Sequence, residues 1–263
     1  IPTISKFFGV NLSKKIKKNK GSFDLIIGNN VFAHVPNIKD FTKGMETLLS
    51  SNGIITLEFP HILNLINQKQ FDTIYHEHFS YLSIKTVNFL LKKFNLEIFD
   101  IEKLPTHGGS VRVYIKKTKN NKIKVKKLKI KKIITMENKY KIFSISTFEK
   151  LQKNINNIKE DFLNFLVLKK LENKKVAAYG APAKGNTFLN FCLVDRNLIQ
   201  YTVDKADTKV GKFLPGSKIP IFSPKKLIKS NPDYLIILPW NLKDEIIKQL
   251  KKMGVKTQFV VCI

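Results

Sequence analysis

Short apolar runs bounded by Gly, Pro or Asn recur along the first part of the chain and predict β-strands. These runs are rich in β-branched and aromatic residues, and they cover residues 2–9, 23–30, 53–60, 96–105 and 110–117. Between the second and third run, residues 37–53 carry apolar side chains at helical spacing and end at a glycine, which predicts a β-α-β crossover with parallel strands. Only the turn THGG separates the last two runs, so they are expected to form an antiparallel hairpin.

The second part of the chain changes to a helical pattern and then to a second α/β unit. Residues 144–172 place apolar side chains three and four positions apart, which predicts a connecting helix with one core-facing stripe. The preceding Lys-rich stretch, residues 116–132, is interpreted as a linker or an exposed edge strand, with a polybasic ligand-binding arm as the alternative. From residue 174 a strand, the loop GAPAKG and a helix offer backbone amides to an anion such as a phosphate.

Asp204 ends the next predicted strand, at the place where a dinucleotide fold holds a ribose. GAPAKG does not match GxGxxG, however, and a helix-cap loop beside a surface Asp explains the same pattern equally well. Both interpretations of this loop stay open from the sequence.

Composition narrows the classes of partner. Among the 263 residues, 43% are hydrophobic, which predicts a folded interior. The formal net charge of +27 suggests nucleic acid, but only Arg112 and Arg196 are arginines, the residue that makes bidentate base and phosphate contacts. We therefore expect the lysines to cover solvated faces, and we expect no nucleic-acid partner. No run approaches the ~20 apolar residues of a membrane span, and Cys192 and Cys262 form no CxxC pair, so a reducing cytoplasm, no membrane and no metal are expected.

The tetrapeptide Tyr75–His78 (YHEH) is the densest cluster of groups that can move protons. Histidine has an unperturbed pKa near neutrality, and a carboxylate or phenol within reach sets its tautomer and basicity. A solvated polar turn that holds two imidazoles is the alternative. In an extended strand, His76 and His78 would share one face and Glu77 would point away, so a catalytic interpretation requires a turn or a helical start here.

Six segments resemble, in this order and spacing, the S-adenosylmethionine-dependent C-methyltransferases of deoxysugar biosynthesis, which act on nucleotide-linked 4-keto sugars. They are GNNVFAHVPNIKDF, EFPHILNLINQKQFDTIYHEHFSYLS, LEIFDIEKLPTHGGSVRVYI, VAAYGAPAKGNTFLNF, VDKADTKVGKFLPGSKIPI and LPWNLKDEI. Members of that family are similar to a protein of three parts: a zinc-binding domain with cysteine pairs, a methyltransferase domain that opens with a glycine-rich cofactor loop, and a C-terminal α/β domain. Since residues 2–9 look like the third strand of the methyltransferase domain, we expect an N-terminally truncated fragment, with zinc only in the missing N-terminal domain.

The resemblance implies an α/β fold, with a truncated Rossmann-like methyltransferase domain followed by a second, smaller α/β Rossmann-like domain. The implied boundaries are residues 1–118 for the methyltransferase part, 119–174 for the Lys-rich linker and connecting helix, and 175–263 for the C-terminal domain. The implied reaction transfers a methyl group from S-adenosylmethionine to the carbon next to the ketone of a nucleotide-linked 4-keto deoxysugar, through an enolate. A monomer is expected. The alternative is a sugar-nucleotide or dinucleotide-binding module without methyltransferase activity.

The resemblance also implies roles for single residues. His78 matches the family's proposed general base, Glu77 and Tyr75 would orient it or hydrogen-bond the sugar, and His34 would lie at the rim of the active site. For the cofactor, the loop after residues 23–30 lies at the carboxyl end of a parallel strand, where open α/β sheets bind ligands. The candidates there are Asn29, Asn30 and Val31, together with Phe8 as a cover for the adenine or as plain core.

Four further residues are candidates for substrate contacts. Lys184 and Asn186 of the GAPAKGNT loop would face the diphosphate, and Arg112 is a phosphate partner or an edge-strand surface cation. His76 is a substrate contact or a structural residue. His61 and His107 are expected to be structural or to support other site residues.

Overall fold

The chain forms two compact units in a computed structural model that describes residues 2–262, apart from the side chain of His107. The first unit comprises residues 1–67 and 76–147, and the second comprises residues 68–75 and 148–263. The prediction that His107 is structural or supports other residues therefore lies outside the described side chains. The compact units divide at residues 147/148, whereas the predicted boundaries lie at 118/119 and 174/175.

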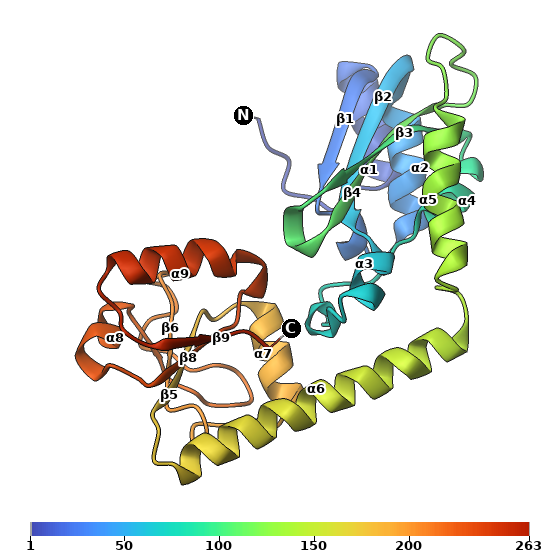
Figure 1. The fold of residues 1–263 in the computed structure, drawn as a ribbon. Coiled ribbons are helices and arrows are strands. Elements are labelled where there is room, and N and C mark those ends of the chain that lie inside the picture. Colours follow the sequence, from blue (N-terminus) through green and yellow to red (C-terminus); the bar gives the residue numbers. More distant parts are fainter. Residues whose placement is uncertain (1, 263) are drawn as a thin grey trace. The chain divides into compact units, whose positions relative to one another are not determined.

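A four-stranded mixed sheet forms the centre of the first unit, in the order β1-β2-β4-β3 (Figure 1). Its strands are β1 (Phe23–Asn29), β2 (Leu49–Pro60), β3 (Leu96–Leu104) and β4 (Ser110–Lys117). β1 and β2 are parallel, while β4 pairs antiparallel with both β2 and β3. The predicted crossover and the predicted hairpin are both confirmed.

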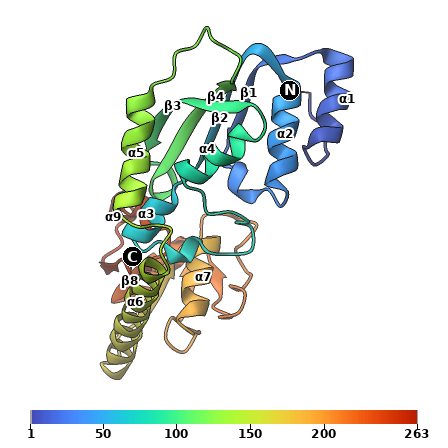
Figure 2. The same ribbon diagram turned by 90° about the vertical axis from the view of Figure 1, so that its right-hand side faces the viewer.

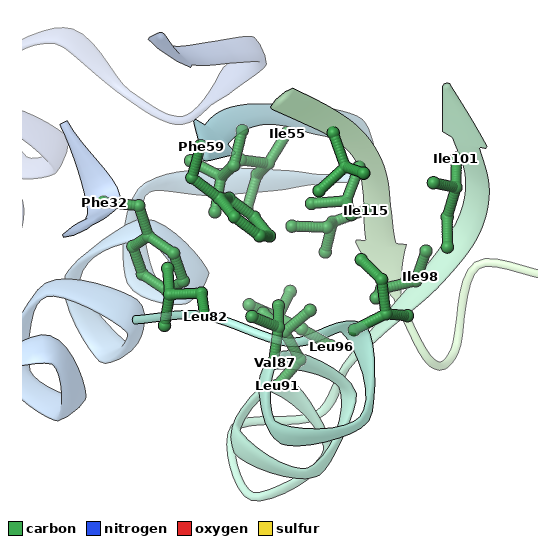
Figure 3. Packing of buried hydrophobic residues seen from close by; sticks show 14 of the residues in the cluster. Phe32, Ile55, Phe59, Leu82, Val87, Leu91, Leu96, Ile98, Ile101 and Ile115 are labelled. Atoms are coloured by element: carbon green, nitrogen blue, oxygen red, sulfur yellow. The ribbon is translucent and has the colours of Figure 1, made fainter. Parts of the chain in front are cut away.

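Three helices cover one face of this sheet: α2 (Ile38–Leu48), α4 (Ile84–Lys92) and α5 (Lys127–Lys139) (Figures 1 and 2). Because strand side chains alternate between faces, every second residue of β2 and β4 points into one core. Figure 3 shows Ile55 and Phe59 of β2 opposite Val87 and Leu91 of α4, all of them buried. The unit also contains α1 (Val10–Lys20), α3 (Ile62–Asn67), and the 3₁₀ turns η1 (Phe32–His34) and η3 (Thr106–Gly108).

Two predictions about the first unit are wrong. Residues 2–9 form no strand; they lead into α1, which packs on α2. Gly44 of α2 permits that approach, since a Cβ at this position would lie 2.8 Å from the carbonyl carbon of Gly9. The later part of the Lys-rich stretch is not an edge strand or a solvated linker but α5, whose Ile130 and Ile133 are buried in the core. The spacing of three between these isoleucines places both on one helical face.

The second unit is built on a five-stranded parallel sheet in the order β7-β6-β5-β8-β9. Its strands are β5 (Val176–Tyr179), β6 (Thr202–Val203), β7 (Ile221–Phe222), β8 (Tyr234–Ile237) and β9 (Gln258–Val260). The chain starts at the central strand, moves to one edge and then returns to fill the other side, which is the doubly wound Rossmann order. The predicted Rossmann-like C-terminal domain is thus confirmed.

Helices flank this second sheet. They are α6 (Ile145–Leu171), α7 (Ala183–Phe191), α8 (Lys225–Ser230) and α9 (Lys243–Lys252), with the 3₁₀ turns η2 (Phe71–Thr73) and η4 (Trp240–Leu242). α6 confirms the predicted connecting helix, and Leu166 on its apolar stripe is fully buried. Phe71 of η2 packs its ring against Phe188 and Phe191 of α7, which ties residues 68–75 to this unit.

Candidate functional site

The carboxyl end of β1 leads into a sharp turn that carries His34. Asn30 follows the strand in the left-handed region, with φ of 52°, a conformation that asparagine tolerates better than other non-glycine residues. Its amide donates to the carbonyl of Glu58 at 2.8 Å, which fixes the turn to β2. η1 begins two residues later and ends at His34, so this imidazole lies at the edge of the sheet where parallel α/β folds bind ligands.

The turn at residues 75–78 brings His78 to the same place. These residues are not a strand, as the catalytic interpretation required. The amides of Phe79 and Ser80 both donate to the carbonyl of Ala33, at 3.0 and 3.2 Å. The rings of His34 and His78 consequently lie 4.6 Å apart between centroids, at an angle of 65°.

His34 has a nitrogen without a protein partner at this position. Its Nε2 atom is buried, and no hydrogen-bond partner for it exists among the described residues. A buried polar atom left in that state costs roughly 1–3 kcal/mol. The atom is therefore suited to a ligand that supplies the missing hydrogen bond next to His78.

The other residues of the YHEH segment have different settings. Glu77, a predicted catalytic residue, and His76, a predicted substrate contact, are exposed in the turn, and Tyr75 is part of the second compact unit. Of the predicted catalytic set, the structure thus brings His34 and His78 together within one unit.

The cofactor candidates lie in two different settings, at the exposed end of a strand and beside the core. Asn29 and Val31 are exposed at the carboxyl end of β1, Val31 with 36% of its surface accessible. Phe8 instead packs its ring edge-on against Phe41 at 5.1 Å, beside the core of the first unit. That contact agrees with the core interpretation of Phe8.

Arg112 is engaged by carboxylates in the middle of the first sheet. β4 lies between β2 and β3, so the interpretation of Arg112 as an edge-strand cation is wrong. Its guanidinium lies 2.8 Å from Glu58 Oε2 and 3.5 Å from Glu102 Oε2. The Thr106 hydroxyl donates to the other oxygen of Glu58 at 2.8 Å. A phosphate at Arg112 would have to compete with both carboxylates.

Side chains from elsewhere in the second unit hydrogen-bond to the backbone of its glycine loop. Asp204 Oδ2 accepts a hydrogen bond from the Ala181 amide at 2.7 Å, and Lys209 Nζ donates to the Ala181 carbonyl at 2.9 Å. Gly180 has φ of +94°, and a Cβ there would lie 2.6 Å from the ring of Pro239. Asp204 therefore occupies a loop amide that a dinucleotide phosphate would need, but it does not cap α7, whose N-cap is Pro182 without a side-chain cap hydrogen bond.

Lys184 and Asn186 project from α7 in the same unit. Lys184 Nζ donates to Asn241 Oδ1 at 2.8 Å and lies 4.6 Å from the centre of the Trp240 ring. Burial lowers the pKa of Lys184, while the charge of Asp72 acts in the opposite direction. Asn186 Oδ1 is buried without a hydrogen-bond partner among the described residues.

Asp72 belongs to this cluster, and the sequence analysis did not single it out. Its side chain is buried, with 1% exposure, and Oδ2 accepts a hydrogen bond from Trp240 Nε1 at 2.7 Å. Burial raises the pKa of Asp72, against the lowering effects of Trp240 and Lys184. The sequence feature that could have identified Asp72 is its position as an acidic residue in the FDT segment just before YHEH, next to residues that are buried in the structure.

Among the described side chains of residues 2–262, which do not include that of His107, no group of three or more His, Cys, Asp or Glu residues is placed to hold a metal ion. No helix in the same range is long and apolar enough to cross a membrane.

Comparisons with known proteins match two parts of the chain to two families. Residues 105–263 match the family described as C-methyltransferase C-terminal domain, and residues 4–101 match a family described as methyltransferase domain. The curated relative C-methyltransferase NovU from Streptomyces niveus is 31% identical over 253 residues. This alignment includes 96% of the chain but only 60% of the relative, so the chain spans about three fifths of that protein's length.

Solved structures give weaker likenesses. An S-adenosylmethionine-dependent methyltransferase from Clostridium acetobutylicum is 12% identical over 36% of this chain and 58% of that chain, with a TM-score of 0.29. The PH0226 protein from Pyrococcus horikoshii is 14% identical over 44% of this chain and 55% of that chain, with a TM-score of 0.31.

Proposed function

Because the chain belongs to the C-methyltransferase family whose C-terminal domain matches residues 105–263, we propose that it works in methyl transfer from S-adenosylmethionine to carbon. The proposed acceptor is the carbon next to the ketone of a nucleotide-linked 4-keto deoxysugar. The observation that carries the proposal is the 4.6 Å approach of His34 and His78 at the carboxyl end of β1. The 31% identity to NovU, a C-methyltransferase, supports the reaction class.

His78 is the proposed general base. It removes a proton from the carbon beside the ketone, and the C–H electron pair becomes the C=C bond of an enolate while the charge moves to the oxygen. His34 is proposed to donate a hydrogen bond from Nε2 to that oxygen, because this buried nitrogen lacks a partner among the described residues. With S-adenosylmethionine bound, its activated methyl group would be taken up by the enolate carbon while the electrons of the methyl–sulfur bond went to sulfur, and His78 would keep the proton.

We propose that residues at the end of β1 contact the cofactor. The exposed Asn29 amide can hydrogen-bond polar groups, and the neighbouring Val31 offers apolar surface. When bound, S-adenosylmethionine supplies a methyl group that its sulfonium charge already activates. The chain's own task is then to hold the two reactants together and to move one proton.

The test replaces the base and follows two reactions. The assay uses a longer polypeptide, in which the glycine-rich cofactor loop implied by the resemblance precedes residues 1–263. In it, His78→Asn should lower kcat roughly a hundredfold or more and leave cofactor affinity nearly unchanged. Without methyl donor, the same variant should stop solvent exchange of the sugar proton beside the ketone.

Lys69→Asn is the matched control, since Lys69 is exposed and has φ of 55°, which asparagine tolerates. It should keep both activities. Normal kcat and normal proton exchange in His78→Asn would refute the assignment of the base.

A further inference from the structure

Residues 61–84, which carry His78, begin and end at one buried carboxylate. The segment starts after β2 and ends where α4 begins. Glu137 of α5 is fully buried, and its Oε1 lies 2.7 Å from Nε2 of His61 and 2.6 Å from the amide nitrogen of Ile84. Its Oε2 lies 3.0 Å from the amide nitrogen of Lys85. One side chain thus joins both ends of the segment.

The chemistry of this contact makes it specific for a carboxylate. The amides of Ile84 and Lys85 belong to the first turn of α4, where helix amides have no intrahelical acceptor and the helix dipole favours negative charge. A fully buried carboxylate is costly unless hydrogen bonds compensate it, and Glu137 accepts two backbone N–H groups and forms a third hydrogen bond with His61 Nε2, which donates in the tautomer that carries its proton there. The donors come from two distant parts of the sequence, so the position of each end depends on the same acceptor.

Backbone contacts carry this position on toward His78. The amide of Ile62 donates to the carbonyl of Leu82 at 3.1 Å, which pairs the two ends directly. Leu82 is buried in the core of the first unit, two residues beyond Ser80. The Ser80 amide is in turn bound to Ala33, beside His34. A shift of the start of α4 would therefore displace the backbone within a few residues of His78.

We propose that Glu137 is a positioning residue that closes the base of residues 61–84 and thereby holds His78 against His34. Its catalytic consequence rests on the proposed function, whereas the closure concerns the first unit alone. The buried His61, expected to be structural or supporting, then has a definite task as the partner at the start of the segment.

Hydrogen exchange in the chain of residues 1–263 tests the closure without any assay of activity. Glu137→Ala removes all three contacts, and we expect the amides of residues 76–82 to exchange roughly tenfold faster or more, because exchange reports local opening. Ile130→Ala is the control, since Ile130 is also buried on α5 but lies in the apolar core. Equal exchange of residues 76–82 in the two variants would overturn the proposal.

Kinetics of the longer polypeptide test the catalytic consequence of the contacts made by Glu137. Glu137→Gln keeps the length of the side chain but loses its charge and presents an NH₂ group to the amides. It should lower kcat roughly tenfold or more and leave the KM for the methyl donor unchanged, because small displacements of a base are costly.

The outcomes separate the two ideas. If His78→Asn keeps full kcat, the proposed function fails, and exchange of residues 76–82 still decides the closure. If His78→Asn loses activity while Glu137→Gln keeps normal kcat and Glu137→Ala keeps normal exchange, the positioning role of Glu137 is refuted.

Discussion

Asp100 offers a quantitative test of how α5 is attached to the sheet. Its carboxylate, on β3, lies 2.6 Å from Lys126 Nζ and 2.8 Å from Lys129 Nζ, at the start of α5. Burial acts to raise the pKa of Asp100, but the hydrogen bonds from Lys126, Lys129 and the Ile101 amide outweigh it and lower the pKa from 3.8 to about 2. The folded state therefore favours the ionised carboxylate.

The shift sets an upper limit for the effect of Asp100→Asn. The difference between 3.8 and about 2 is about 1.8 pKa units and corresponds to about 2.5 kcal/mol at about 1.4 kcal/mol per unit. The side chains of Lys126 and Lys129 are 61% and 49% exposed, so solvent screens the pairs strongly. We expect Asp100→Asn to lower the free energy of unfolding by about 1 kcal/mol at pH 7. Because the folded pKa is depressed, this stabilisation is present above pH 3.8 and is lost as the pH falls toward 2.

Urea denaturation of residues 1–263, followed by circular dichroism at pH 7 and pH 3, measures this difference. Asp207→Asn is the control because it removes one exposed negative charge from a chain with a formal net charge of +27. Equal losses in the two variants would show general charge repulsion and refute the local ion pairs. A loss in Asp100→Asn that is as large at pH 3 as at pH 7 would refute the assigned pKa shift.

Three further predictions concern the loops of both units. In the longer polypeptide, Lys184→Ala should raise the KM for the nucleotide sugar roughly tenfold without changing methyl-donor affinity, as loss of a charge-assisted hydrogen bond would; an unchanged KM would leave Lys184 its contacts with Asn241 and Trp240 and no substrate role. Trp240→Phe should lower the free energy of unfolding by about 1–3 kcal/mol in urea denaturation, because the buried Asp72 carboxylate loses the hydrogen bond from the indole N–H. Burial raises the pKa of Asp72, so its carboxylate is protonated and this loss should shrink as the pH falls toward 3.8. Asn30→Val should cost about 1–2 kcal/mol in the same assay and Asn30→Gly much less, and equal costs would argue against the left-handed turn.

Patterns that repeat along one element were sufficient to predict much of the fold. The β1-α2-β2 crossover, the β3-β4 hairpin, α6 and a second α/β unit all follow from runs of apolar residues whose period depends on local geometry alone, whereas the Rossmann-like fold of that unit was implied by the resemblance. The spacing argument also showed that a catalytic role for YHEH would require a turn or a helical start, and the structure has a turn there. The resemblance in six ordered segments predicted the C-methyltransferase family, to which the chain belongs.

Some local patterns were misleading because two structures share them. The Lys-rich stretch alternates like an edge strand, but Ile130 and Ile133 also fit one face of a helix, and burial against the sheet decided for the helix. Residues 2–9 are apolar enough for a strand, yet the structure gives them no strand partner among the described residues. A strand needs a neighbour for its hydrogen bonds, and no local pattern identifies that neighbour.

The chemistry of the sites depended on contacts between distant parts of the chain, which only the tertiary structure could decide. The sequence by itself determined that His78 lies in a segment rich in proton-carrying groups, and it predicted His34 as a site residue through the resemblance. It did not determine that Glu137, inside a stretch interpreted as a linker, binds the start of α4, or that Asp72 meets Trp240. Hydrogen bonds form wherever folding brings a donor and an acceptor within about 3 Å, irrespective of their separation along the chain. A buried carboxylate shows its role only when its partners are known, because burial without them would be too costly.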